Sequence, residues 1–250
     1  MLTNARRIGQ DVYDTVRLFG AAAIAVNPAL FASLSYDLFR DFVPISLICR
    51  TPLCMVVPKD SAVRDVAGLI AQARSQPEGM IYGSSGSGTI PHVAVEDFAT
   101  RAGIRLTHVP YRGGAAAMQD LMGGRLPMMM ESVPTLLPLI RAGDIRPLAV
   151  AEAQPIAVLP GVPPLAEQGF PGFAAAAWNA LLVPAGMPRD IVARLESETM
   201  EMLLEPETMR RVEALGAIPV GSSAAELDAF LHAEATRWAE VVRRTGATAN

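Results

Sequence analysis

Glycine and small polar residues gather in one short stretch of the chain, residues 82–92, which reads Tyr-Gly-Ser-Ser-Gly-Ser-Gly-Thr-Ile-Pro-His. A helical pattern follows the stretch directly, so its end is predicted to be a helix amino terminus. Helix amino termini leave backbone N–H groups unpaired and carry partial positive charge, so they attract anions. Because glycine lets the backbone approach a ligand closely, this stretch is predicted to hold a small anion, and a carboxylate fits it best.

Three other chemistries are excluded at this stretch by its spacing. A phosphate-binding loop has Lys after its last glycine, where this chain has Thr89. A dinucleotide-binding loop needs a third glycine at the position that Pro91 occupies. A serine nucleophile elbow needs Gly-x-Ser-x-Gly, and neither Ser85 nor Ser87 lies between glycines at that spacing. A plain Gly/Ser turn that caps the following helix is an equal alternative.

A second junction of the same kind lies at residues 110–115, which read Pro-Tyr-Arg-Gly-Gly-Ala. It also comes between a predicted strand and a predicted helix. The carboxyl ends of strands in an open α/β sheet are where ligands bind. We therefore expect both junctions to line one cleft, which would hold an anion mainly with neutral backbone and hydroxyl donors.

The composition of the 250-residue chain favours a folded protein with a sizeable apolar core. Hydrophobic residues make up 51% and charged residues 18%, which argues against disorder. The net charge is −4 and the basic residues are scattered, so nucleic acid is not an expected partner. Mean hydropathy is +0.29. No apolar run reaches the roughly 18 residues of a membrane span, because Asn27, Pro28 and Ser33 interrupt the most apolar stretch.

The cysteines and histidines are too dispersed to form a metal site, and no cofactor is predicted. Cys49 and Cys54 lie in one predicted strand. Extended chain separates them by roughly 16 Å and turns them to opposite faces, whereas a disulfide needs Cα atoms within about 7 Å. We therefore expect two buried thiols.

Strand and helix patterns alternate along the chain, which favours an α/β fold. Strands are predicted at residues 16–19, 45–57, 80–83, 106–109, 128–130, 147–151 and 177–183. Helices are predicted at residues 66–74, 91–102, 115–122, 134–141 and from 188 onward, with a proline-rich surface passage at 155–171. Both junctions fall in a middle block, so we expect two lobes, made of residues 1–54 with 176–250 and of residues 55–175. Two crossovers would then form a hinge.

Several longer motifs follow one another along residues 13–245. They include Ile24-Ala-Val-Asn-Pro-Ala-Leu-Phe31, the two junctions, Leu121-Met-Gly-Gly124 and Trp178-x-x-Leu-x-x-Pro-Ala-Gly-x-Pro188. Through this ordered set the chain resembles the periplasmic receptors of the tripartite tricarboxylate transporter system, often called Bug receptors. The resemblance implies a two-lobe type II periplasmic-binding-protein fold, delivery of a ligand to membrane permease subunits, and no catalysed reaction. It also implies a small carboxylate ligand: a dicarboxylate, an acidic amino acid or an aromatic acid.

With this resemblance, the small and polar residues of both junctions become candidate ligand contacts, and two residues outside them join the set. His92 is weighed equally as a ligand contact and as a structural histidine, whereas His108 is expected to be structural. The Arg112 side chain ranks below Tyr111 and the amides that follow it. Glu131 would repel an anion unless it points away or binds an ammonium group. The candidates are Ser84, Ser85, Gly86, Ser87, Gly88, Thr89, His92, Tyr111, Gly113, Gly114, Ala115, Ser132 and Asn27.

The beginning of the chain differs from the pattern that the resemblance implies. Relatives are expected to carry a signal peptide and a further βαβ unit before the point that matches Tyr13, and this sequence shows neither pattern. Ile24 and Pro127 also stand where a polar residue and an aspartate are expected. We therefore expect an N-terminally truncated chain whose first lobe lacks one cleft wall. Weak ligand binding and a homo-oligomer that covers the exposed sheet edge would follow.

Two rival functions stand beside the receptor. A truncated member that has lost its ligand site would act as a sensor or an interaction module. A serine hydrolase would need a base beside a serine of the first junction and an acid to orient that base. His92 is the candidate base near these serines.

Overall fold

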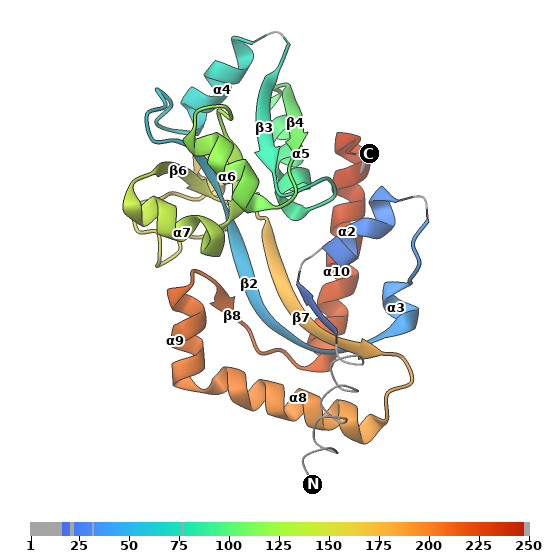
Figure 1. Cartoon of the computed structure of the whole chain (residues 1–250). Helices are drawn as coiled ribbons and strands as arrows, with labels where there is room; N and C mark the ends of the chain where they lie inside the picture. Colours follow the sequence, from blue (N-terminus) through green and yellow to red (C-terminus); the bar gives the residue numbers. More distant parts are fainter. Residues whose placement is uncertain (1–16, 21–22, 32, 77, 248–250) are drawn as a thin grey trace.

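The computed structural model describes residues 17–20, 23–31, 33–76 and 78–247, which form a mixed α/β fold (Figure 1). The predictions about the start of the chain fall on residues 1–16, outside the described residues. The described strands are β1 (Arg17–Gly20), β2 (Phe42–Pro58), β3 (Met80–Ser84), β4 (Leu106–Pro110), β5 (Met129–Ser132), β6 (Ile145–Val150), β7 (Ala176–Pro184) and β8 (Ile218–Pro219). The described helices are α2 (Ala23–Leu30), α3 (Leu38–Asp41), α4 (Val66–Arg74), α5 (Ile90–Ala102), α6 (Gly114–Met122), α7 (Val133–Ala142), the 3₁₀ turn η1 (Leu165–Gln168), α8 (Arg189–Leu204), α9 (Pro206–Ala214) and α10 (Ala224–Thr245).

The long strand β2 runs through both parts of the molecule and organises the sheet (Figure 1). It pairs antiparallel with β7 as far as Pro52, and from Leu53 onward it pairs with β5 and β6. β1 and β8 complete the first part, whereas β3 and β4 extend the second part through β5. We call the first part, with α2, α3, α8, α9 and α10, the first lobe. The second part, with α4 to α7, is called the second lobe.

The sheet of the second lobe is mixed. β3 pairs parallel with β4 and β5, whereas β5 and β6 pair antiparallel with β2. Successive residues of β2 enter two different cores: Leu53 and Met55 join the larger one, and Cys54 and Val56 join the smaller one. Both faces of this part of β2 are therefore covered, which explains the unbroken apolar run from Leu53 to Val57. Cys54 and Cys49 are buried free thiols, as expected.

Helix α10 connects the two lobes along one side of the molecule (Figure 1). Ser223 and Glu226 form the predicted capping box at its start. Trp238, further along the helix, is buried in the larger core. Near the end of the helix, Arg244 forms an ion pair with the buried Asp97 of α5, which belongs to the second lobe. One helix thus packs on the first lobe and is held to the second.

The predicted elements of the middle block match β3 to β6 and α4 to α7 closely. Sequence patterns do not predict α2 or α3, and the prediction of helix from residue 188 onward is wrong at β8, which lies between α9 and α10. Pro28 lies inside α2, where proline removes a backbone donor, and burial of Ile24 and Val26 in the core shared with α10 outweighs that local cost. β8 has two residues, too few for a periodic pattern. The predicted assignment of residues 1–54 and 176–250 to one lobe and 55–175 to the other stays a prediction.

Candidate ligand-binding cleft

A hollow of about 290 Å³ lies where the first and second lobes meet. The first lobe contributes residues of β2 and β7, and the second lobe contributes the first junction, the end of β5 and the starts of α5 and α7. The hollow is lined by Thr51, Ser85, Thr89, Ile90, Pro91, Glu131, Ser132, Pro134, Ala177, Trp178 and Asn179. This volume is close to the lower end of the range for small-molecule pockets, so the hollow is the candidate site.

The first junction turns the amino terminus of α5 toward the hollow. Ser85, Thr89 and Ile90 line it, and Thr89 is the N-cap residue of α5 without a side-chain cap hydrogen bond. The Thr89 hydroxyl instead donates to the carbonyl of Gly86 at 2.7 Å. The Ser85 hydroxyl has no hydrogen-bond partner among the residues that the structure describes. Ser85 and the positive end of α5 are therefore available to an anion.

Ser84 lies behind the junction rather than in the hollow. Its side chain is fully buried, and its Oγ atom lies 2.6 Å from Nε2 of His108. The same oxygen accepts a hydrogen bond from the amide of Gly86 at 3.1 Å. The Ser84–His108 pair has the spacing of a nucleophile and its base, but a substrate cannot reach the buried hydroxyl. The pair therefore holds the turn of the loop.

His92 supports the same loop from within α5. Its side chain is buried, and its Nδ1 atom accepts a hydrogen bond from the amide of Gly88 at 3.1 Å. The rings of His92 and His108 stack with their centroids 4.0 Å apart. Burial lowers the pKa of His92, and burial together with the neighbouring His92 lowers the pKa of His108 to about 4. Both rings are therefore neutral near pH 7, and this geometry favours the structural interpretation of His92.

The second junction lies beside the first, at the carboxyl ends of the parallel strands β3 and β4. The amide of Tyr111 donates to the carbonyl of Ser84 at 3.1 Å, and the amide of Gly113 donates to the carbonyl of Ser85 at 3.3 Å. The Tyr111 hydroxyl donates to Asp120 of α6 at 2.6 Å. None of residues 111–115, all of which the structure describes, lines the hollow. The fold thus brings the two junctions together but opens only the first onto the hollow.

Glu131, in β5, lies in front of the amino terminus of α6, the helix that follows the second junction. A Cβ atom added to Gly114, the first residue of α6, would lie 2.9 Å from Oε2 of Glu131. Oε1 accepts a hydrogen bond from the amide of Ser132 at 2.8 Å. Oε2 is buried and has no partner among the described residues. The protein's own acidic side chain therefore lies at the amino terminus of α6, where a bound anion was expected.

Of the remaining predicted ligand contacts, some line the hollow and others lie outside it. Ser132 lines the hollow. Asn27, in α2, donates to the hydroxyl of Tyr36 at 3.1 Å. Gly88 faces the first lobe, where a Cβ atom on it would lie 3.2 Å from Leu30. The predicted residues that the structure describes outside the lining are Ser84, Gly86, Ser87, Gly88, His92, Tyr111, Gly113, Gly114, Ala115 and Asn27.

Sequence reasoning does not identify the first-lobe wall of the hollow. That wall includes Thr51 of β2 and Asn179 of β7. Both residues lie near the point where β2 changes partner from β7 to β5. Ligand pockets occur preferentially where two domains meet. The predicted passages of the chain between the lobes, at residues 54–55 and 175–176, are therefore the sequence feature that could have indicated Thr51 and Asn179.

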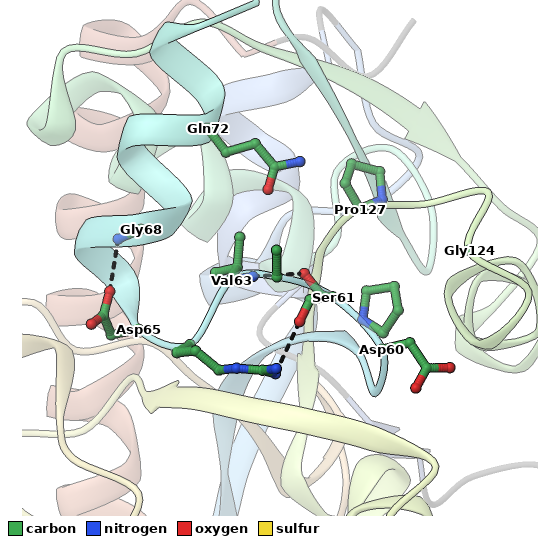
Figure 2. Close-up of a pocket in the computed structure, with 11 residues that line it drawn as sticks. Asp60, Ser61, Val63, Asp65, Gly68, Gln72, Gly124 and Pro127 are labelled. Atoms are coloured by element: carbon green, nitrogen blue, oxygen red, sulfur yellow. Dashed lines mark hydrogen bonds between the residues drawn. The ribbon is translucent and has the colours of Figure 1, made fainter.

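A larger hollow of about 790 Å³ lies in the second lobe beside α4 (Figure 2). Asp60 and Asp65 are among the residues that line it. Asp65 caps α4 by accepting a hydrogen bond from the amide of Gly68 at 2.7 Å, and Arg64 donates to the carbonyl of Ser61 at 2.9 Å. These side chains serve the local turn, and the acidic groups oppose an anion. The larger hollow is therefore not the candidate carboxylate site.

The two lobes share the continuous strand β2 and enclose a hollow at a helix amino terminus, and small ligands bind preferentially in hollows between such units. The described residues contain no group of three or more His, Cys, Asp and Glu side chains that would hold a metal ion. None of the described helices combines the length and the hydrophobicity needed to cross a membrane.

The chain belongs to the tripartite tricarboxylate transporter receptor family, whose model matches residues 5–247. It is 32% identical over 237 residues to BugT of Bordetella pertussis, and the match covers 95% of this chain and 73% of that protein. R. palustris Rpa4515, solved with adipate, is 34% identical with a TM-score of 0.87, over 92% of this chain and 77% of that one. MatC from Rhodopseudomonas palustris, solved with bound malate, is 27% identical with a TM-score of 0.79, over 91% of this chain and 78% of that one.

These matches confirm the predicted family and the predicted periplasmic-binding-protein fold. The family consists of periplasmic transport receptors, so at the level of the family this chain is a receptor rather than an enzyme.

Proposed function

We propose that this chain captures a small carboxylate in the hollow between its lobes. It would do so in the periplasm and deliver the ligand to the membrane permease subunits of a tripartite tricarboxylate transporter. The observation that carries the proposal is the opening of the α5 amino terminus onto a hollow lined by Ser85, Thr89 and Ser132. The adipate in Rpa4515 and the malate in MatC support the ligand class.

Neutral donors hold the carboxylate in this proposal. No lysine or arginine of the described chain lines the hollow. Backbone amides, serine hydroxyls and the partial positive charge of α5 therefore replace a salt bridge. Each neutral hydrogen bond contributes about 1 kcal/mol, so several must act together. We assign Ser85, Thr89 and the α5 amino terminus to the carboxylate, and Ser132 to the rest of the ligand.

The predicted residues outside the lining have a supporting role in this proposal. Ser84 and His92 fix the shape of the first junction through the amides of Gly86 and Gly88. Their hydrogen bonds keep the loop turned so that the α5 amino terminus faces the hollow. Loss of either side chain would therefore weaken binding indirectly, by loosening the loop.

Isothermal titration calorimetry against a panel of acids tests the proposal. The panel contains succinate, glutarate, adipate, malate, aspartate, glutamate and benzoate, with the matching neutral amides as controls. We expect at least one acid to bind with a single site per chain and its amide not to bind. Failure of every acid, in a sample that melts cooperatively, would contradict the proposal.

A further inference from the structure

We propose that Glu131 makes the hollow prefer acids that also carry a hydrogen-bond donor, an ammonium or hydroxyl group, over acids that carry carboxylates alone. This inference rests on the proposed function, because it narrows the ligand class of the same hollow. It starts from two facts about one side chain. Glu131 lines the hollow, and its Oε2 atom is buried without a hydrogen-bond partner among the described residues.

The buried Oε2 atom indicates a donor that the described chain does not supply. Buried polar atoms are nearly always hydrogen-bonded, and leaving a charged one without a partner is especially costly. Glu131 is 6% exposed, so bulk water does not compensate it. Its other oxygen, Oε1, already accepts a hydrogen bond from the amide of Ser132 at 2.8 Å. The capacity of Oε2 to accept a hydrogen bond is therefore unused by the residues that the structure describes.

The amino terminus of α6 explains why an acidic side chain lies at this place. Gly114 has no side chain, and a Cβ atom there would come within 2.9 Å of Oε2. The partial positive charge at the start of this nine-residue helix favours an anionic group in front of it. Glu131 thus fills the anion position of α6, which leaves the carboxylate of a ligand to the α5 amino terminus.

The hollow therefore has two unlike poles. At Ser85 and Thr89 the α5 amino terminus attracts a carboxylate, whereas at Glu131 an acidic group meets the ligand. No lysine or arginine of the described chain lines the hollow, so the lining supplies no cation to Glu131. A second carboxylate would be repelled there, but an ammonium or hydroxyl group would donate to Oε2. Because protein atoms cover Oε2 in this structure, the contact requires the Glu131 carboxyl group to rotate toward the hollow.

Calorimetry with three matched acids tests this preference. Succinate carries carboxylates alone, malate adds a hydroxyl group, and aspartate adds an ammonium group. Glutarate with glutamate, and adipate with 2-aminoadipate, repeat the comparison for longer ligands. For the wild-type chain we expect the amino acid to bind about tenfold or more tightly than the plain diacid, with the hydroxy acid between them. Glu131→Gln keeps the size but removes the charge, and we expect it to abolish the preference by weakening the binding of the amino acid and tightening the binding of the plain diacid.

Glu96→Gln is the matched control variant. Glu96 is a half-buried glutamate outside the lining, where it accepts a hydrogen bond from the Tyr82 hydroxyl at 2.5 Å. This substitution should leave the preference unchanged, and a preference lost equally in both variants overturns the role of Glu131.

The wild-type chain separates failure of this inference from failure of the proposed function. If plain diacids bind to it as tightly as the matching amino acids, or more tightly, the inference is overturned and the carboxylate receptor stands. If no acid in the panel binds, the proposed function itself is contradicted. The comparison of ligands on the wild-type chain requires no variant. It therefore tests the inference even if Glu131→Gln does not fold.

Discussion

The two glycine junctions follow neighbouring parallel strands, begin helices without a side-chain cap, and contain glycines with positive φ. At α5, Ser85 and Thr89 open the helix end onto the hollow. At α6, Glu131 of β5 covers the helix end above Gly114. A local sequence pattern can therefore create a helix end that attracts anions, whereas the use of that end depends on what a distant strand places in front of it.

The junctions also differ in the groups that hold their shape. Neutral His92, which is buried, and neutral His108, which is partly buried, support the first junction through Gly88 and Ser84. Asp120 supports the second junction, since it accepts hydrogen bonds from the Tyr111 hydroxyl at 2.6 Å and from Arg125 Nε at 2.8 Å. Hydrogen bonds from Arg125 and then Tyr111 lower the pKa of Asp120. The first junction thus depends on histidines that stay neutral, and the second on an aspartate that stays charged.

Replacing one glycine in each junction should produce the largest contrast. φ is +78° at Gly88 and +100° at Gly113, and such conformations cost a non-glycine residue about 1–3 kcal/mol. An alanine at position 88 would also place its Cβ 3.2 Å from Leu30. We expect Gly88→Ala and Gly113→Ala both to melt below the wild-type chain. Gly88→Ala alone should weaken carboxylate binding, by about tenfold or more.

Circular dichroism melting and calorimetry, carried out well below both melting transitions, measure these two effects separately. Gly113→Ala is the control for strain, because nothing lies within 4 Å of a Cβ atom at that position. An equal loss of affinity in both variants would show that the ligand uses both helix ends. The second helix end would then bind the ligand although Glu131 covers it in this structure.

Acid should loosen the first junction at a higher pH than the second. The pKa of His108 is about 4 in the folded chain, against about 6.5 for an ordinary histidine, so the unfolded chain takes up the proton first. The stability linked to His108 is therefore fully present above about pH 6.5 and is lost as the pH falls toward 4. The pKa of Asp120 is lowered in the folded chain. The stability linked to Asp120 is therefore lost only as the pH falls below about 3.9, the ordinary pKa of an aspartate.

His108→Gln tests this order, because glutamine does not titrate but can still hydrogen-bond to Ser84. Its melting temperature should fall less than that of the wild-type chain between about pH 7 and pH 4.5. His232→Gln, at an exposed position of α10, is the control and should behave like the wild type. An unchanged acid dependence in His108→Gln would separate the histidine pair from the stability of the first junction.

Helices that begin or end at a recognisable capping residue are predicted well from the sequence. α4 begins at the Asp65 cap, and α5 and α7 end at Gly103 and Gly143, which adopt left-handed conformations. The sequence of α2 argues locally against a helix, because Pro28 lies inside it. The helix forms because it packs against α10. Local chemistry therefore predicts the second lobe, while the start of the first lobe depends on contacts that are distant in sequence.

The candidate site divides in the same way. Ser85, Thr89 and Ser132 line the hollow and lie where a strand ends or a helix begins, which sequence patterns can indicate. The position of Glu131 above Gly114 arises when β5 is placed beside β3, and Asn179 reaches the hollow through the pairing of β7 with β2. Pairing between strands that are distant in the sequence produces no local sequence pattern, so the sequence alone does not predict that these residues are neighbours.

The smallest expected effect tests whether neutral donors or one ion pair hold the ligand. Ser85 lines the hollow with a hydroxyl that has no partner among the described residues, whereas Arg112 is exposed and lies outside the lining. Ser85→Ala should weaken binding by about 1 kcal/mol, roughly fivefold, and Arg112→Ala should leave the affinity unchanged. Titrations at low and high salt complete the test, because an exposed ion pair is screened by salt. Loss of binding in Arg112→Ala with a silent Ser85→Ala would place one dominant ion pair at the second junction and reverse the roles of the two helix ends.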